Sequence, residues 1–240
     1  MTSGQPAGPE EPPRPRRVSR QREAGEATRR ETRRRLLAAA KAEFAERGYA
    51  AATVIRIAER ADMSVQTLYS NWGNKRNLLR AVMESSVTGD EDVPLVAGQP
   101  PAVMTATIDP ADAADPHRLL AHLSHQYRLL AERSAVGWQT YREGAGVDPD
   151  IAADWLQLSD VRRRGFHAFF AMVPLGALRP GLSNAAAADT AWVIASPDTY
   201  DQLVRHAGYS FDQLEDWVLA TVTAALLPAG HLSQVPKPPR

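Results

Sequence analysis

The side chains with the most suggestive chemistry lie in residues 64–72, which have the periodicity of a helix. Val65, Leu68 and Trp72 recur at i, i+3 and i+7 and therefore fall on one apolar stripe. The rest of the circumference is polar and uncharged: Gln66, Thr67, Tyr69, Ser70 and, at its edge, Asn71. Amides and hydroxyls can pair with base edges in a DNA major groove, where Gln suits adenine and Thr meets the thymine methyl group. An ordinary solvated helix would also fit, so the flanking segments decide between the two interpretations.

Three short helices are predicted around this segment, each opened by a polar residue. Thr53, Ser64 and Asn74 can each accept hydrogen bonds from the free backbone N–H groups of the turn that follows. Only Asp62 and Met63 separate the first two helices. Two helices joined so tightly pack at a steep angle, which is the helix-turn-helix arrangement.

Positive charge flanks this unit on both sides. The preceding helix, predicted from Thr28 to a stop at Gly48, carries five arginines in its first two turns: Arg29, Arg30, Arg33, Arg34 and Arg35. A helix N-terminus prefers anions, so a phosphate backbone nearby would relieve the conflict. Lys75 opens the following helix, where an ammonium beside free N–H groups suits a phosphate. These flanks favour base reading over the plain solvated helix.

Charge is divided unevenly along the 240 residues, although the formal net charge is zero. Residues 1–88 hold 17 Lys and Arg against 10 Asp and Glu, whereas residues 89–240 hold 11 against 18. A basic first third suggests a module for a polyanion, joined to a part with another role. The absence of cysteine excludes disulfides and thiolate metal sites. No apolar run approaches the roughly 20 residues that span a bilayer, and the N-terminus lacks the apolar core of a secretory signal. We expect a cytoplasmic protein without a membrane partner.

The composition changes along the chain predict five segments. Residues 1–27, with five prolines and three glycines, are expected to be a disordered tail. Residues 28–88 form the helix-turn-helix domain, 89–112 a linker rich in proline and glycine, 113–230 a second helical domain, and 231–240 a short disordered tail.

The second domain is also predicted to be helical, and no alternating β pattern appears, so the fold class is all-α. The expected helices cover residues 115–133, a separate stretch around Trp138 and Tyr141 that stops at Gly144, and then 149–173, 184–195, 197–208 and 210–227. The run 162–164, three consecutive arginines, is interpreted as a solvated helix face or as donors of salt bridges. Small alanines make 184–195 and 210–227 our candidates for a dimer interface.

The N-terminal pattern resembles the DNA-binding domain of the tetracycline-repressor (TetR) family over roughly residues 28–85. The residues that carry the resemblance are Phe44, Gly48, Tyr49, Thr53, Val54, Ile57, Ala58, Ala61, Ser64, Thr67, Leu68, Tyr69, Trp72, Lys75, Leu78 and Leu79. Asp62 stands where the family often has glycine in the turn, and Asp is one of the residues that tolerate a left-handed conformation. Arg56 replaces a frequent acidic residue, and Trp72 replaces the usual phenylalanine.

This resemblance implies a bacterial, all-α homodimer that inserts a helix-turn-helix into the major groove of a double-stranded operator. It implies a separate C-terminal domain for ligand binding and dimerisation. Position by position, Gln66 and Thr67 would read bases with help from Val65 and Asn71. By the resemblance, Thr53, Tyr69 and Lys75 would contact phosphates; Ser64, and Arg56 where the chain departs from the family pattern, are further candidates for phosphate contacts.

A subset of the aromatic residues in the second domain is expected to line an apolar effector pocket between helices. The candidates are Tyr127, Trp138, Tyr141, Trp155, Phe166 and Phe170. We expect no cofactor and no metal, since His117, His122 and His125 lack a carboxylate in a ligand pattern. No catalytic motif is recognisable, so we expect no enzymatic activity.

Together these features indicate a ligand-responsive transcriptional repressor that binds an inverted-repeat operator as a homodimer and is released by a small, largely apolar effector. Two alternatives stay open. A constitutive DNA-binding regulator would share every N-terminal feature, and an enzyme fused to a DNA-binding module would need a catalytic cluster in the second half.

Overall fold

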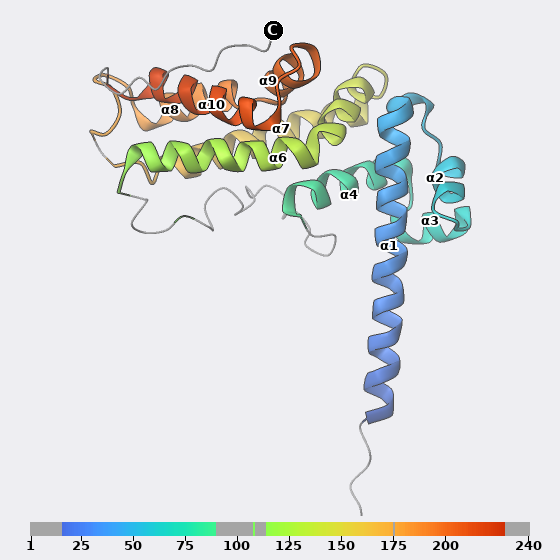
Figure 1. Cartoon of the computed structure of the whole chain (residues 1–240). Coiled ribbons are helices and arrows are strands. Elements are labelled where there is room, and N and C mark those ends of the chain that lie inside the picture. The colour runs from blue at the N-terminus through green and yellow to red at the C-terminus, as the bar shows by residue number, and fades with distance from the viewer. Residues whose placement is uncertain (1–15, 90–107, 109–113, 175, 229–240) are drawn as a thin grey trace, which may run out of the picture.

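The computed structural model of this chain describes residues 16–89, 108, 114–174 and 176–228 (Figure 1). Every regular element in these ranges is helical, as the sequence predicted. The elements are α1 (Arg16–Ala51), α2 (Val54–Arg60), α3 (Val65–Trp72), α4 (Lys75–Thr88), α6 (Pro116–Ala145), α7 (Pro149–Phe170), α8 (Asn184–Ile194), α9 (Pro197–Tyr200), the π-helical turn η2 (Asp201–His206) and α10 (Phe211–Leu226). Within the described ranges, no helix is both long and apolar enough to cross a membrane.

The first helix begins earlier than predicted. α1 starts at Arg16, so the expected disordered tail is wrong for residues 16–27, whereas residues 1–15 lie outside the described part. Beyond Pro15 the sequence is rich in Arg, Glu, Gln and Ala, which favour helix, and the Thr28 hydroxyl donates to the carbonyl of Ala24 at 2.9 Å. The expected tail at 231–240 and most of the linker at 89–112 also lie outside the described residues.

Gly48 interrupts the far end of α1, close to the predicted stop. Its φ of 68° and ψ of 177° are not helical, and the chain resumes one more turn to Ala51. A Cβ at this position would lie 2.5 Å from Oε2 of Glu143 on α6. Glycine is therefore favoured here by the left-handed backbone conformation, whereas the contact with the flexible end of Glu143 could be relieved by moving that side chain.

The three predicted helix caps are confirmed. The side chains of Thr53, Ser64 and Asn74 accept hydrogen bonds from the backbone N–H three residues later, at 3.3, 3.0 and 2.8 Å. Asp62 adopts a φ of 53° between α2 and α3, so the turn forms with aspartate where the family often has glycine. These local features fix the steep packing of α3 on α2 that the sequence predicted.

The N-terminal core is completed by residues of the second domain. Its buried side chains from α1 to α4 include Leu36, Ala40, Phe44, Ile57, Leu68, Leu78, Leu79 and Val82, and Tyr141 and Ile151 pack in the same cluster. Tyr141, on α6, is fully buried. The two domains therefore share an apolar contact.

α6 is one continuous helix of 30 residues, so the predicted break between 133 and 138 is wrong. No proline interrupts this part, and Gly137 lies inside the helix because α4 passes close to it. A Cβ on Gly137 would lie 2.7 Å from Sδ of Met83 on α4. Figure 1 shows α6 running from the α8–α10 layer to α1 and α4, so this helix connects both parts of the molecule.

In the second domain α7 and α10 pack against α6, and α8 packs against α7 and α10. Its core includes Leu119, Leu123, Phe166, Phe169, Phe170, Ala187, Ala188, Ala191, Leu214, Val218 and Val222. Three alanines of α8 are thus buried within the domain, which lets α8 lie close to its neighbours. The predicted helix boundaries at 184, 197 and 210 agree with the structure to within one residue.

Candidate functional site

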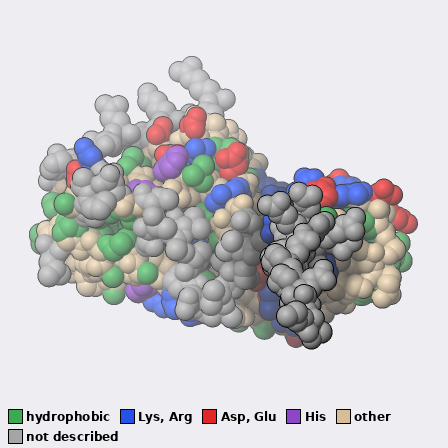
Figure 2. Space-filling model, turned by 90° about the horizontal axis from the view of Figure 1, so that it is seen from below, with side chains coloured by type: hydrophobic (Ala, Val, Ile, Leu, Met, Phe, Trp, Pro, Cys, Tyr) green, Lys and Arg blue, Asp and Glu red, His purple; other side chains and the backbone are tan. Residues whose placement is uncertain are grey.

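The exposed surface of α3 is uncharged. Gln66 is exposed, and its side-chain amide makes no hydrogen bond within the described residues. The ring of Tyr69 is 45% exposed beside it, and the Ser70 hydroxyl is turned back to the Gln66 carbonyl at 2.8 Å. In Figure 2, the right-hand part of the molecule, where Figure 1 places α2 and α3, is mainly uncharged, with charged side chains along its edges. This surface leaves an amide and a phenol free for another molecule.

The other predicted base readers are more constrained. Val65 and Thr67 are partly buried, and Val65 packs against the core of the domain. The Thr67 hydroxyl lies 2.8 Å from the Ser64 hydroxyl, and the Asn71 amide donates to the Thr67 carbonyl at 2.7 Å. Gln66 is the predicted base reader with the most freedom.

Of the predicted phosphate ligands, Arg56 and Lys75 differ most in their surroundings. Arg56 is exposed on α2, and its guanidinium has no partner in the part of the chain that the structure describes. Lys75 instead directs its ammonium into the domain. Its Nζ donates to the carbonyls of Tyr49 at 2.7 Å and Ala52 at 3.0 Å, and lies 4.2 Å from the centre of the Tyr49 ring. Burial lowers the pKa of Lys75.

Two of the α1 arginines, Arg33 and Arg35, contact residues of α2 and α3 instead of pointing only into solvent. The guanidinium of Arg33 lies 4.4 Å from the centre of the Trp72 ring, and Arg35 donates to the Ala61 carbonyl at 2.6 Å, at the end of α2. Arg35 also lies 3.5 Å from the carboxylate of Asp62. These contacts hold the helix-turn-helix against α1 and position the α3 surface.

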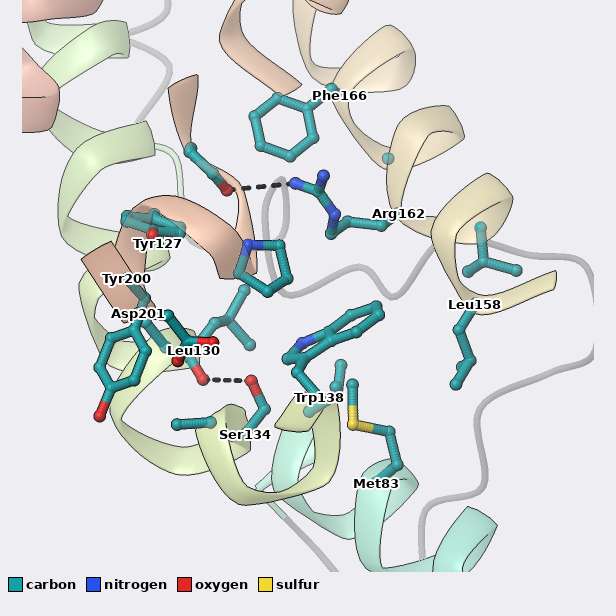
Figure 3. A pocket seen from close by; sticks show the side chains of 17 residues that line it. Met83, Tyr127, Leu130, Ser134, Trp138, Leu158, Arg162, Phe166, Tyr200 and Asp201 are labelled. Atoms are coloured by element: carbon teal, nitrogen blue, oxygen red, sulfur yellow. Dashed lines mark hydrogen bonds between the residues drawn. The ribbon is translucent and has the colours of Figure 1, made fainter. Parts of the chain in front are cut away.

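A cavity lies between the two domains, about 15 residues along α6 from its start (Figure 3). The volume within it that the centres of water molecules can occupy is about 100 Å³. A single water molecule needs roughly 10–15 Å³ of such volume, so the cavity is large enough for a small organic molecule. Its lining residues are Met83, Val87, Tyr127, Leu130, Ala131, Ser134, Ala135, Trp138, Leu158, Val161, Arg162, Gly165, Phe166, Ala195, Pro197, Tyr200 and Asp201. α4 of the N-terminal domain thus forms part of the wall, together with α6, α7, α9 and η2.

Half of the predicted pocket residues line this cavity. Tyr127, Trp138 and Phe166 do so, and Figure 3 shows Trp138 and Phe166 projecting toward the same space. The other three are packed elsewhere: Tyr141 lies in the N-terminal core, Trp155 packs edge-on against Trp138 at 5.4 Å, and Phe170 packs edge-on against Phe169 at 5.5 Å.

Sequence reasoning missed the polar residues of the cavity wall. Arg162 faces the cavity, so the interpretation of 162–164 as a solvated face or as salt-bridge donors is wrong for its first member, whereas Arg163 and Arg164 pair with Asp189 and Asp160. The sequence did carry a signal for this: Arg162 stands four residues before Phe166, so both side chains lie on the same face of α7. Asp201 had no such signal because η2 reaches the cavity only through the tertiary fold.

The polar groups of the wall are held in place by other parts of the chain. Arg162 donates from Nη1 to the carbonyls of Trp192 and Ala195, both at 3.1 Å, and from Nη2 to Trp192 at 3.0 Å. Burial lowers the pKa of Arg162 to about 10. The Tyr127 hydroxyl donates to the Ser196 carbonyl at 2.8 Å, and burial raises its pKa. Asp201 is bound by Arg142 at 2.7 Å.

Comparison with known proteins agrees with both parts of this arrangement. The family model of the bacterial regulatory proteins of the tetR family matches residues 36–82, which include α2, α3 and most of α4. No protein of the curated set matches the sequence.

Solved structures share the fold along nearly the whole chain. The triclosan complex of SmeT, a repressor from Stenotrophomonas maltophilia, is 21% identical with a TM-score of 0.63, over 87% of this chain and 99% of SmeT. NalD, the secondary repressor of the MexAB-OprM multidrug efflux pump in Pseudomonas aeruginosa, is 16% identical with a TM-score of 0.56, over 83% and 98%. A TetR-type regulator from Rhodococcus sp. is 16% identical with a TM-score of 0.59, over 81% and 97%.

The matched helix-turn-helix segment and the fold shared with these regulators agree with each other. Residues 36–82 match the DNA-binding module of the tetR family of bacterial regulatory proteins, and the chain shares its fold with TetR-type transcriptional regulators.

Proposed function

We propose that this protein is a ligand-responsive transcriptional repressor that binds an inverted-repeat operator as a homodimer. α1–α4 would form the DNA-binding domain and α6–α10 the effector-binding and dimerisation domain. The observation that carries the proposal is the exposed, uncharged surface of α3, on which the Gln66 amide is free. A free amide on a helix docked in the major groove can pair bidentately with adenine.

The phosphate contacts would come from the edges of this surface. Arg56 is exposed on α2, and Tyr69 offers a phenolic hydroxyl three residues after Gln66 on α3. The hydroxyls of Thr53 and Ser64 cap their helices and, because an oxygen that accepts one bond can still donate another, both stay candidates. The role of Lys75 at a phosphate requires its ammonium to leave the two carbonyls that it now binds.

The cavity supports the ligand-responsive part of the proposal. Met83 and Val87 belong to α4, whose N-terminal end follows α3 after two residues, so the cavity wall and the α3 surface are mechanically connected. A small molecule with a largely apolar body would contact α4, α6 and α7 together. It shifts the protein away from the operator-binding geometry only if it binds another geometry more tightly. The complex of SmeT with triclosan provides a precedent for a small effector in a protein of this fold.

The dimer interface that we favour is formed by α8 and α10. Ala186 and Val193 are exposed on the same face of α8, about two turns apart, and Val193 is 60% exposed although it is apolar. On α10, Ala224 is exposed and Trp217 partly exposed. An isologous pairing of these faces would present two α3 helices to half-sites one duplex turn or a multiple apart.

The test is capture of genomic fragments by the purified full-length chain, followed by sequencing and by a screen for compounds that release the captured fragments. The proposal expects enrichment of an inverted repeat and release by at least one small molecule. Enrichment without any releasing compound would favour the constitutive regulator, and the absence of enrichment would contradict operator binding. If the protein converted one of the releasing compounds into a product over many turnovers, that would favour the enzyme fused to a DNA-binding module.

A further inference from the structure

Arg162 carries the least compensated charge on the cavity wall. Within the described residues its guanidinium makes no ion pair: it donates to the carbonyls of Trp192 and Ala195, and the carboxylate of Asp198 acts on it only from beyond ion-pair distance. Burying a cation away from water without a counter-ion is costly. A fold that holds such a group at the edge of a cavity has a place for an anion.

Asp201, the carboxylate of the cavity lining, and Asp198 three residues before it are both paired with arginines. Asp201 binds Arg142 at 2.7 Å and lies 3.6 Å from Arg205, and Asp198 lies 3.3 Å from Arg142. Asp201 therefore offers little attraction to a cationic ligand. Arg162 is left as the cation that faces the cavity without a carboxylate partner in the described chain.

The surroundings of Arg162 fix its orientation without using all of its donors. A guanidinium has five N–H groups, and its three hydrogen bonds to two carbonyls leave at least one N–H for a ligand. The rings of Phe166 and Trp192 lie 5.5 and 5.1 Å from its central carbon. The guanidinium is thus held in one place and needs little rearrangement to bind an oxyanion.

We propose that the effector of this cavity is an organic carboxylate with an apolar, aromatic body, and that Arg162 binds its carboxylate group. The body would lie against Met83, Leu130, Trp138 and Leu158, which line the cavity (Figure 3). This assignment rests on the proposed function, because it names the chemical class of the effector that the same cavity takes.

The test uses matched aryl probes that differ in charge and little in shape: benzoate and 2-naphthoate, their carboxamides, and 2-naphthylmethylamine. Binding to the full-length protein is measured by calorimetry and by the shift of the melting temperature. We expect at least one carboxylate to bind ten times or more tighter than its carboxamide, and the amine to bind more weakly still. Equal binding of carboxylate and carboxamide, or a preference for the amine, would overturn the assignment.

Substitution of Arg162 locates the selectivity. Arg162→Met should reduce the ratio of carboxylate to carboxamide affinity to about one, while Arg163→Met should leave the ratio unchanged because Arg163 binds Asp189 at 2.7 Å outside the cavity. Arg162→Lys, which keeps the charge, should retain part of the preference and serves where the methionine variant fails to fold. An undiminished ratio in either Arg162 variant would contradict the proposal.

A parallel titration with captured operator DNA separates this inference from the proposed function. Release of operator by a carboxamide or an amine, but by no carboxylate, would overturn the anion assignment and leave the ligand-responsive regulator intact. Operator binding that no probe class alters, with no probe bound in calorimetry, would overturn the cavity as an effector site as well.

Discussion

At the scale of single residues, cations around the helix-turn-helix serve two different purposes. Lys75 and Arg35 bind backbone carbonyls at the turns on either side of α2, whereas Arg56 is exposed with no partner in the described chain. Both kinds sit near the surface that would face DNA. Their substitution should therefore give different results in folding and in binding experiments.

Lys75→Met should destabilise the protein. Two carbonyls that accept from an ammonium lose their donor, and hydrogen bonds to charged groups contribute about 1.5–3 kcal/mol where they are protected, so we expect a loss of roughly 1–3 kcal/mol. Urea unfolding followed by circular dichroism measures it. A wild-type unfolding midpoint would show that these bonds contribute nothing.

Arg56→Met is the matched control for this variant. Since Arg56 is exposed, its substitution should change the free energy of unfolding by less than about 0.5 kcal/mol. If Arg56 contacts a phosphate, the same variant should weaken binding to operator and random DNA alike and reduce the salt slope by about 1.

The features predicted best at this scale are those that depend on neighbours in sequence. The caps at Thr53, Ser64 and Asn74 and the turn at Asp62 follow from local backbone chemistry. Asp201 could not be assigned to the cavity because its ion-pair partner Arg142 lies on another helix that only the fold brings near, and the local spacing of Arg162 from Phe166 gave no hint of its partners 30 or more residues away.

At the scale of elements, α4 is held to the second domain by a cluster of ion pairs. The carboxylate of Asp154 on α7 is buried, and it accepts from Arg76 at 2.8 and 2.9 Å and from Arg80 at 2.7 Å. Both arginines belong to α4. The hydrogen bond from Arg76, and then that from Arg80, hold the pKa of Asp154 below its usual value. This cluster fixes the orientation of α4 relative to the cavity wall.

Asp154→Asn should lower the free energy of unfolding by about 1.5–3 kcal/mol at pH 7, because charge-assisted bonds become neutral ones. A lowered folded-state pKa contributes stability above the unfolded value near 3.9, and that contribution is lost as the pH falls. The difference between wild type and variant should therefore shrink between about pH 5 and pH 3 in urea titrations. A difference that stays constant over this range would contradict an electrostatic role for Asp154.

Asp150→Asn provides the control. Asp150 also pairs with Arg76, at 3.1 Å, but its side chain is 71% exposed, where an ion pair is worth about 0–1 kcal/mol. We expect a small change in stability from this variant at every pH.

Helix boundaries were predicted where a cap or a proline marks them, and missed where packing decides. The starts of α7, α8 and α10 follow from Asp148, Ser183 and Ser210. The continuity of α6 through Gly137 was missed because no apolar residue in helical spacing links Leu130 to Trp138 apart from small side chains and glycine. The early start of α1 was missed because the prolines and glycines of the first 27 residues outweighed its helix-forming residues.

At the scale of the whole molecule, the proposed function requires two copies. Sedimentation at micromolar concentration should give about twice the chain mass of 26.2 kDa. Val193→Asp would place a charge in the proposed α8–α10 interface and should shift the protein toward monomer. Val147→Asp is the control, because Val147 is 66% exposed between α6 and α7. A monomeric wild type, or equal effects of the two variants, would contradict this interface.

The central claim is that α3 reads DNA sequence through Gln66. The most direct measurement compares the affinity of wild type and Gln66→Ala for a captured operator and for random DNA at one salt concentration, by fluorescence anisotropy. We predict a loss of about 1–3 kcal/mol on the operator and almost none on random DNA, with wild-type thermal stability, since Gln66 is exposed and one bidentate base contact has about that value. Equal losses on both DNAs, or no loss on the operator, would contradict the claim.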